Sequence, residues 1–257
     1  MRRLPRALIG HTGFVGSNLA RGLPFELHFN SSNIDHIRGL ELELVVCAGV
    51  SAVKWQANRA PKEDWNGIQA LIERLDKVQA RRFVLISTVD VYGDPRGVDE
   101  DTPIAEEALH PYGRHRRALE RWVTGRFPSS LIVRLPALFG EGLKKNVIYD
   151  LMHENMVDAI NPASRFQWYP LRRLPDDLSR LLDTPLNSVN VAPAPVLTSD
   201  IIGRFFPRVP TGEQVLPAPH YDVRTRHAAV LGGVGDYHLS APQVLTELDT
   251  FLAKARE

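Results

Sequence analysis

Three glycines near the start of the chain have the spacing of a phosphate-binding loop. Gly10, Gly13 and Gly16 lie in the segment IGHTGFVGSNLA, between a short apolar run and a helix pattern. A pyrophosphate needs close approach of the backbone and N–H groups at the start of a helix, and glycine allows both. We therefore expect the loop to bind a dinucleotide, although glycines of a tight turn would have a similar pattern in isolation.

The histidines and the single cysteine are weaker indications of a functional site than the glycine loop. The nine histidines include no HExxH or other paired metal spacing, so no metal site is expected. Cys47 lies in an apolar run and is expected to be a packed thiol. Because it is the single cysteine of the chain, no internal disulfide can form, which indicates a reducing compartment. His115, in the stretch YGRHR, is either a surface histidine or a proton carrier.

The elements that must position the glycine loop follow from alternating patterns of apolar residues. The expected strands are 6–9, 25–30, 42–48, 83–86 and 131–135, and the expected helices between them are 14–21, 65–75 and 112–127. Strands that alternate with helices predict a parallel sheet with right-handed crossovers. The expected fold class is α/β, a Rossmann-type doubly wound parallel sheet with helices on both faces and a small C-terminal substrate lobe.

The pattern loosens after Pro136, where prolines become frequent. Helices are expected at 176–182, 198–206 and 244–255, and a late strand of the same sheet at 188–191. We predict a dinucleotide-binding Rossmann domain over 1–139, to which 170–195 return. The small substrate-binding lobe is predicted over 140–169 and 196–257.

Composition narrows the classes of partner. The chain has 257 residues and a net charge of +1, so no general field attracts nucleic acid or an anionic membrane. No apolar stretch approaches the roughly 20 residues that cross a bilayer. The apolar run at the start is too short for a signal peptide. We expect a soluble cytoplasmic protein whose partner is a small-molecule substrate.

Several motifs in the same order resemble the extended short-chain dehydrogenase/reductase family, which includes nucleotide-sugar epimerases, dehydratases and reductases. They are the GxxGxxG loop, VVCAGVS, LISTVDVYG, HPYGRHRRALE, RLPALFG and YDVRT. VVCAGVS is similar to the third-strand segment that lines the adenine and ribose. Asn66 resembles a family asparagine that supports the fold near the site. The resemblance covers nearly the whole chain, which is shorter than most extended members.

The resemblance implies a role for each matching residue. Thr88 would hydrogen-bond the substrate oxygen, Tyr112 would transfer its proton, and Arg116 would orient the cofactor and the tyrosine. The cofactor-binding residues are expected to be Gly10, Thr12, Gly13, Phe14, Val15, Gly16, Asn30, Ser31, Ser32, Ala48, Gly49, Tyr112, Arg116, Leu135 and Pro136. The substrate residues are expected to be Asp90, Tyr92, Asn146 and Arg224. The resemblance also implies a homodimer.

The end of the second expected strand departs from the usual NAD site. An acid commonly stands there to hold the adenosine ribose, but the sequence is FNSSNID, with no acid before Asp35. Asn30, Ser31 and Ser32 offer neutral hydrogen bonds that would not repel a 2′-phosphate, and Arg38 follows a few residues on. The cofactor is NADP or NAD, with a slight preference for NADP. Plain turn residues are the alternative interpretation of this segment.

The second departure is Arg116, which replaces the lysine of the family's YxxxK motif. Tyr112 and Arg116 are four residues apart, so they share one helix face. A cation about 4 Å from the tyrosine contributes about 4 kcal/mol to stabilising the tyrosinate at an effective dielectric constant of 20, before desolvation. Arginine supplies that charge but cannot release its proton. The alternative interpretation is a solvated charge within RHRR.

Three functions follow from these residues. The first is an NAD(P)-dependent reductase, dehydrogenase, epimerase or dehydratase that transfers hydride at a carbinol or ketone carbon. The resemblance makes its substrate a nucleotide-linked sugar or another small polyol or ketone. The second is a dinucleotide-binding sensor or scaffold that has lost turnover, which Arg116 favours. The third is an enzyme that keeps the fold and the cofactor but runs different chemistry, in which the cofactor is recycled within each turnover.

Overall fold

Six strands form the central sheet of the computed structural model, which describes residues 3–255. Along the chain they are β1 (Arg6–Ile9), β2 (Leu27–Phe29), β3 (Glu41–Cys47), β4 (Gln79–Thr88), β6 (Ser130–Leu135) and β10 (Ser188–Asn190). Their order in the sheet is β10-β6-β4-β3-β1-β2. The pairs β1–β2, β1–β3, β3–β4 and β4–β6 are all parallel. The mostly parallel sheet confirms the predicted α/β class.

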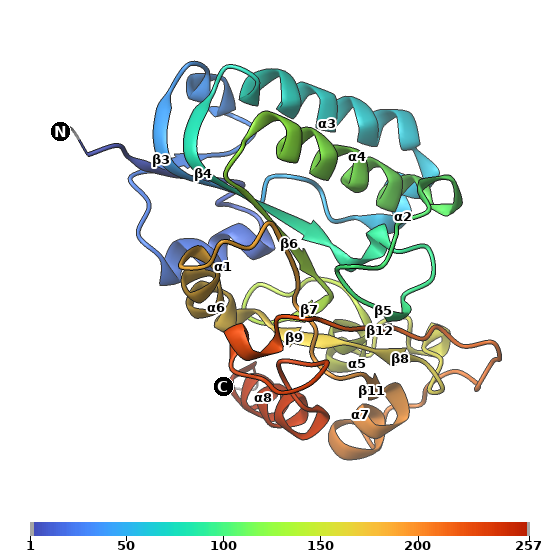
Figure 1. Cartoon of the computed structure of the whole chain (residues 1–257). Helices are drawn as coiled ribbons and strands as arrows, with labels where there is room; N and C mark the ends of the chain where they lie inside the picture. Colours follow the sequence, from blue (N-terminus) through green and yellow to red (C-terminus); the bar gives the residue numbers. More distant parts are fainter. Residues whose placement is uncertain (1–2, 256–257) are drawn as a thin grey trace. The chain divides into compact units, whose positions relative to one another are not determined.

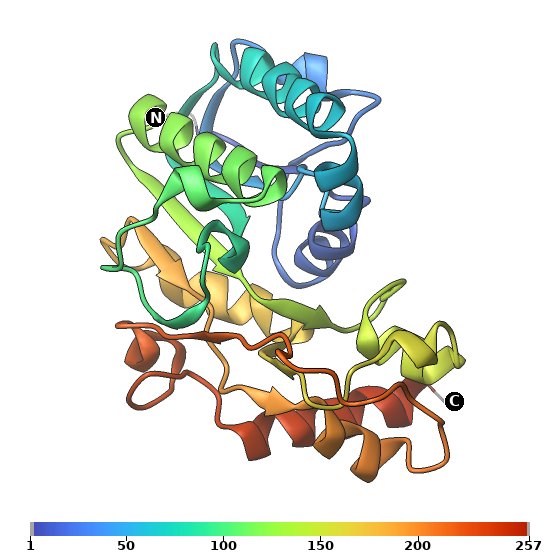
Figure 2. The same cartoon turned by 90° about the vertical axis from the view of Figure 1, so that its right-hand side faces the viewer.

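Helices cover both faces of this sheet, which is why its strands are apolar on both sides. Helices α3 (Pro61–Leu75) and α4 (Pro111–Arg126) lie side by side on one face, and α1 (Phe14–Gly22) and α6 (Leu174–Leu182) pair on the other (Figures 1 and 2). Every residue of β6 is buried. Leu75, Leu119 and Val123 of the α3 and α4 helices pack on a core that includes Phe83 of β4.

Among residues 3–255, the sheet lacks the outermost strand that the usual dinucleotide-binding sheet has on the β2 side. The usual order is 3-2-1-4-5-6, in which a third strand lies outside the second. Among residues 3–255, β2 is the last strand on its side. The chain passes from β2 through the short 3₁₀ helix η1 (Ile34–Ile37) directly to β3, on the other side of β1.

This order places VVCAGVS, the segment predicted to line the adenine and ribose, beside the first strand. The segment belongs to the third strand along the chain, but it lies in the position that the fourth strand has in the usual order. A sequence pattern shows how many strands precede a segment. It does not show which strand of the usual order is absent.

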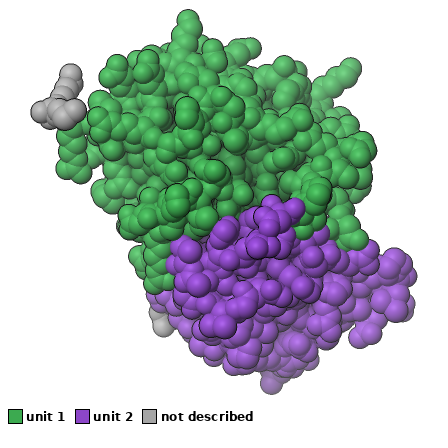
Figure 3. All heavy atoms as spheres, in the orientation of Figure 1, with its two compact units in different colours: residues 1–94, 102–135, 174–189 green, residues 95–101, 136–173, 190–257 purple. Residues whose placement is uncertain are grey.

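The chain divides into two compact units, and each is described by itself (Figure 3). Unit 1 comprises residues 1–94, 102–135 and 174–189. It contains all six sheet strands apart from Asn190, the last residue of β10. It also contains three short elements, which are α2 (Lys54–Arg59), η2 (Val89–Val91) and η3 (Glu106–Ala108).

Unit 2 comprises residues 95–101, 136–173 and 190–257. Its two-stranded pairs are β11 (Val196–Leu197) with β8 (Arg165–Phe166), β12 (Asp222–Val223) with β5 (Arg96–Val98), and β7 (Ala137–Phe139) with β9 (Trp168–Pro170). Its helices are α5 (Val147–His153), α7 (Thr198–Phe205) and α8 (Ala241–Ala255), with 3₁₀ helices η4 (Val157–Ala159), η5 (Leu171–Arg173) and η6 (Ala228–Leu231). The buried Gln167 side chain joins two segments by donating to the carbonyls of Pro193 and Val223. No helix within residues 3–255 has the length and apolar character of a membrane span.

Candidate functional site

The glycine loop is shaped by contacts between backbone atoms. Gly10 has φ +84°, and its N–H donates to the carbonyl of Phe29 at 2.7 Å. A Cβ on Gly10 would lie 2.5 Å from the carbonyl oxygen of Ala48. A Cβ on Gly16 would collide with the carbonyl of Gly10. These two glycines are therefore required for the loop itself to form.

Gly13 differs from the other two glycines. It precedes α1 with φ −79°, and a Cβ there would approach only the Gly10 carbonyl, at 3.3 Å. Thr12 and Gly13 are exposed, whereas Phe14 and Val15 are partly buried. The fold thus leaves the Gly13 position open at the start of a helix, where an anion is favoured.

The segment after β2 forms a local hydrogen-bonded turn. The side-chain oxygen of Asn30 accepts from the N–H of Ser32 at 2.9 Å and from its hydroxyl at 2.6 Å. The carboxylate of Asp35 pairs instead with Arg74 at 3.0 Å and with Arg38 at 3.4 Å. The acid nearest in sequence is therefore held against α3 by these two arginines.

Thr88 and Tyr112 meet where β4 ends and α4 begins. Thr88 is the last residue of β4, and its hydroxyl accepts from the N–H of Asp90 at 3.1 Å. Tyr112 lies in the first turn of α4, and its N–H donates to the side chain of Asn58 at 3.0 Å. Burial raises the pKa of Tyr112, and the nearby Arg116 charge and a hydrogen bond with Thr88 oppose that rise. Tyr112 is therefore protonated at neutral pH in this structure.

Arg116 is buried and its guanidinium is bound on several sides. Nη1 lies 2.5 Å from one oxygen of Asp64, and Nη2 lies 2.8 Å from the other. Nη2 also donates to the carbonyl of Ser51 at 2.5 Å, and Nη1 to that of Tyr112 at 3.3 Å. Its Cζ stands 3.9 Å from the centre of the Tyr112 ring. Since Arg116 is only 4% exposed, the interpretation as a solvated charge is wrong.

Sequence reasoning missed Asp64, the acid that holds Arg116. The predicted supporting residue of this helix, Asn66, is exposed. Asp64 also accepts a hydrogen bond from Nδ1 of His115 at 2.7 Å. Burial alone would raise the pKa of Asp64, but hydrogen bonds with Arg116 and His115 outweigh it and lower the pKa. An acid in the first turn of a helix is common, so its sequence position carried no signal for this contact.

Asp90 and Tyr92 contact other side chains of unit 1. Asp90 forms an ion pair with Lys54 of α2 at 2.7 Å. Tyr92 is buried, and its hydroxyl accepts from Nη1 of Arg134 at 2.8 Å. Arg134 in turn binds Glu120, which is fully buried on α4. The predicted substrate residue Tyr92 is thus joined to a buried charge network.

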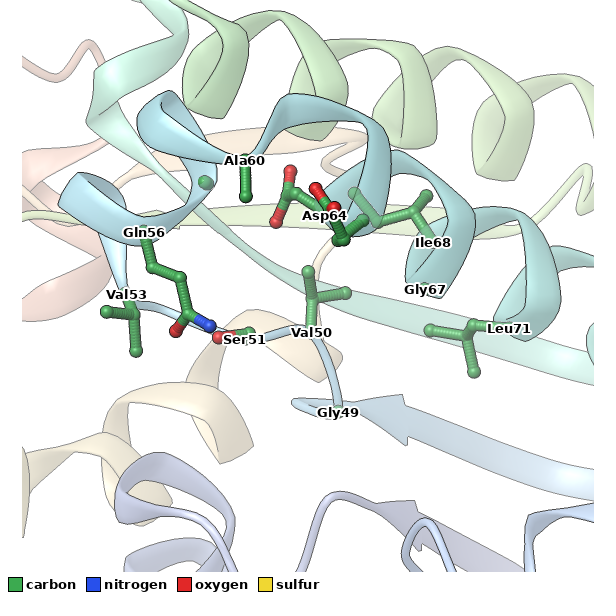
Figure 4. A pocket seen from close by; sticks show the side chains of 12 residues that line it. Gly49, Val50, Ser51, Val53, Gln56, Ala60, Asp64, Gly67, Ile68 and Leu71 are labelled. Atoms are coloured by element: carbon green, nitrogen blue, oxygen red, sulfur yellow. The ribbon is translucent and has the colours of Figure 1, made fainter.

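A cavity of about 310 Å³ opens between the end of β3 and helices α2 and α3 (Figure 4). Gly49 lines it and also lies against Gly10, since a Cβ on Gly10 would be 2.6 Å from the Gly49 Cα. Apolar side chains form one part of the wall and polar side chains the other. The lining residues include Val50, Ile68 and Leu71 on the apolar side and Ser51, Gln56 and Asp64 on the polar side.

Two predicted substrate residues lie in unit 2, where other groups hold their side chains. The Asn146 side chain accepts from the N–H groups of Ile148 and Tyr149, which caps α5, and donates to the carbonyl of Leu138. Arg224 pairs with Asp222 at 3.1 Å and with Asp236 at 3.4 Å. The predicted cofactor residues Leu135 and Pro136 follow one another where β6 ends, and Leu135 is buried.

More than half of the chain, residues 30–162, matches the sequence model described as the NAD dependent epimerase/dehydratase family. No curated protein matches the sequence.

Solved structures with the same fold cover almost the whole chain. The dTDP-4-dehydrorhamnose reductase of Bacillus anthracis in complex with NADP has a TM-score of 0.76 at 16% identity over 99% of both chains. MoeE5 in complex with UDP-glucose and NAD has a TM-score of 0.76 at 16% identity, over 98% of this chain and 99% of its own. A UDP-galactose 4-epimerase has a TM-score of 0.73 at 18% identity, over 97% of this chain and 99% of its own.

Proposed function

The chain belongs to the NAD dependent epimerase/dehydratase family, and from this premise we propose that it is an NAD(P)-dependent enzyme acting on a nucleotide-linked sugar. The observation that carries the proposal is the buried pair Thr88–Tyr112 with the guanidinium of Arg116 beneath the tyrosine ring. The Tyr112 hydroxyl in this arrangement can exchange a proton with a substrate hydroxyl or carbonyl, as reduction, epimerisation and dehydration require.

The glycine loop and the adjoining cavity fit a dinucleotide. Gly10 and Gly16 leave no room for side chains, and Gly13 keeps the start of α1 open. We assign the pyrophosphate to this loop and the adenosine to the cavity that begins at Gly49. Ala48, Leu135 and Pro136 remain proposed cofactor contacts. When bound, the cofactor supplies hydride acceptance and donation at its nicotinamide.

Tyr112 acts as the proton donor of the site. Its pKa is raised by burial, so the hydroxyl carries its proton at neutral pH. Thr88 orients that hydroxyl and the substrate oxygen. Arg116 holds its charge against the tyrosine ring and stabilises the tyrosinate that forms after proton transfer. Asp64 and Ser51 fix the guanidinium in this place.

The cofactor preference rests on the turn after β2. Asn30, Ser31 and Ser32 carry no negative charge, and Asp35 is held by Arg74. A 2′-phosphate would therefore meet no repulsion there, which favours NADP slightly over NAD. Asp90, Tyr92, Asn146 and Arg224 remain the proposed substrate residues, and a homodimer remains the proposed assembly.

The test is turnover of a panel of nucleotide sugars. UDP-glucose, UDP-galactose, UDP-glucuronic acid and dTDP-4-dehydrorhamnose are each incubated with oxidised and reduced NAD and NADP, and the products are separated by chromatography. Tyr112→Phe keeps the ring over Arg116 but removes the proton, so its rate should fall about 100-fold or more while cofactor affinity is kept. Near-normal turnover in that variant would remove Tyr112 from the mechanism.

One observation favours a second function, a dinucleotide-binding sensor or scaffold. Arg116 cannot release a proton, and Asp64 binds both of its terminal nitrogens. A sensor would bind NAD(H) or NADP(H) without converting any sugar of the panel. Binding measured by calorimetry together with an inactive parent protein would select this function.

A further inference from the structure

Unit 2 contains a buried histidine whose ring nitrogens have no hydrogen-bond partner. His238 is 2% exposed, and neither Nδ1 nor Nε2 makes a hydrogen bond. Buried polar side chains in proteins almost always have at least one partner. The neutral ring buries one unpaired N–H, whereas the protonated ring would bury two unpaired N–H groups and a charge, which costs far more. The fold around His238 therefore selects the neutral ring.

Backbone contacts hold the chain at His238 in place. Its N–H donates to the Ala192 carbonyl at 3.0 Å. The chain is also pressed against Gly233, where any Cβ would collide with the His238 backbone. The side chain packs on the Tyr169 ring of β9, with 5.5 Å between the ring centres. Water reaches the ring only if these contacts open.

The charged side chains on this side of unit 2 do not favour a second cation. Arg173 of η5 acts on the ring with its positive charge. Glu247 belongs to α8, which packs on β9, and its carboxylate is already bound by Arg172 at 2.6 Å and by Arg173 at 3.3 Å. The segments 190–194 and 228–235 contain no titratable side chain. An imidazolium would therefore meet repulsion from Arg173 and a carboxylate that is already engaged.

The titratable neighbours of His238 in the chain are also engaged. Tyr237 donates to Asp222, and Asp236 pairs with Arg224 at 3.4 Å. Burial lowers the pKa of His238 to about 4, although a backbone carbonyl opposes the shift and a nearby guanidinium adds to it. The closed form of unit 2 therefore holds this ring neutral well into the acid range.

We propose that His238 makes unit 2 sensitive to acid: the neutral ring holds the segment 237–239 closed, and a proton enters only when that segment opens. Unit 2 also carries the proposed substrate residues Asn146 and Arg224. Acid opening would then act on the substrate side of the enzyme and not on the glycine loop of unit 1. Only this consequence rests on the proposed function, because the acid sensitivity needs no ligand.

The pH range of the effect follows from the two forms of the histidine. An unfolded histidine has a pKa near 6.5, so the neutral ring contributes its full stability above that pH. The contribution is lost as the pH falls from 6.5 towards 4, because the opened form then binds a proton that the closed form does not. Between pH 8 and pH 5, His238 should raise the opened fraction about 30-fold.

Loss of carboxylate ion pairs also weakens a fold in acid, but mainly below about pH 5, where aspartate and glutamate take up protons. The range from pH 8 to pH 5 therefore isolates the histidine. His238→Phe keeps a buried ring and removes both nitrogens, and His238→Leu removes them with a smaller side chain. His153→Phe, at an exposed position at the end of α5, is the matched control.

The first measurement is hydrogen exchange followed by mass spectrometry on peptides that cover 190–194 and 237–239. Each rate is divided by the intrinsic chemical rate at the same pH. From pH 8 to pH 5, protection should fall about 30-fold in the parent and in His153→Phe, and less than about threefold in His238→Phe and His238→Leu. Equal falls in the parent and in both His238 variants would overturn the proposal.

The second measurement uses the parent chain, so it decides the proposal even if both His238 variants fail to fold. The histidine rings are labelled with ¹³C at Cε1, and the His238 signal is assigned through its backbone and followed by NMR from pH 8 to pH 4. A midpoint below about pH 5.5 supports the proposal. A midpoint above that value would show that the closed fold accepts the proton, and the proposal would be wrong.

Discussion

At the scale of single residues, the guanidinium of Arg116 and the carboxylate of Asp64 form a pair that is almost closed to solvent. Their side chains are 5% and 7% exposed. A buried ion pair contributes little net stability, but removing one member leaves the other charge buried without its partner. His115 is the only further side chain that the structure places on Asp64 within the described residues. The pair therefore constrains which substitutions Arg116 tolerates.

We expect Arg116→Met to lower the free energy of unfolding by on the order of 3 kcal/mol, because Asp64 loses its bidentate partner. Asp64→Asn combined with Arg116→Met should recover a substantial part of that loss. Arg116→Lys keeps the charge without the planar fork, so its loss should fall between parent and Arg116→Met. Urea denaturation measures all four proteins. Equal stability of Arg116→Met and the parent would contradict the pairing.

The same series reports on Tyr112. Loss of the Arg116 charge removes a group that stabilises the tyrosinate, so the pKa of Tyr112 should rise further. In a pH–rate profile, the limb that reflects tyrosine ionisation should therefore move to higher pH in the stable double variant. Arg116→Lys should leave that limb close to its place in the parent.

At the scale of elements, Glu120 joins α4 to the ends of two sheet strands. Its carboxylate accepts from the Ser87 hydroxyl at 2.6 Å, from Arg134 at 2.9 and 3.0 Å, and from Arg117 at 3.0 Å. The network fixes the strand end that carries Thr88 relative to the helix that carries Tyr112. Because Glu120 has no exposed surface, no water replaces these bonds.

Glu120→Gln removes the charge that balances buried Arg134, so we expect it to cost about 3 to 5 kcal/mol of stability. Glu106→Gln is the control, since Glu106 pairs with Arg117 and Arg121 but is 26% exposed. That control should cost less than about 1 kcal/mol. The stability of both variants is compared with that of the parent by their urea midpoints. Equal losses would show that Glu120 contributes no more to stability than Glu106.

Elements with strong local patterns were predictable. β1 has the expected bounds, because its apolar run stands between Pro5 and Gly10. Helix α2 was not predicted, since it has six residues and only Ala57 is buried. β8 and β11 have two residues each, too few for a period to appear in the sequence.

The site was predictable only in part. The structure brings Thr88, Tyr112 and Arg116 together. This grouping was predictable because Thr88 ends one strand and the other two residues lie four apart on one helix. Asp64 and Lys54 come from other helices, and their contacts depend on how α2 and α3 pack on α4. Such contacts between distant segments leave no spacing rule in a single sequence.

At the scale of the whole molecule, the proposed dinucleotide site consists of the glycine loop and the cavity that begins at Gly49. Within residues 3–255 no strand lies beyond β2, so we assign the adenosine to the cavity beside α2 and α3. Binding at the glycine loop should then be the main source of ligand stabilisation. A substitution at its open position should abolish that stabilisation while leaving the fold intact.

Gly13→Val tests this dependence. A ligand at 100 times its dissociation constant stabilises the folded chain by about 2.7 kcal/mol, which in a chain of this size raises Tm by several degrees. NAD(H) or NADP(H) should produce that rise in the parent and in Gly125→Ala, a helix glycine whose added Cβ would meet nothing within 4 Å. Gly13→Val should have a slightly lower Tm than the parent without ligand, because its Cβ would lie 3.3 Å from the Gly10 carbonyl oxygen. It should show no rise with either cofactor, because its side chain fills the space that the pyrophosphate needs. The same titrations compare the two cofactors: a larger rise with NADP(H) fits the neutral turn after β2, and a clearly larger rise with NAD(H) would mean that an acid such as Asp35 leaves Arg74 to bind the ribose.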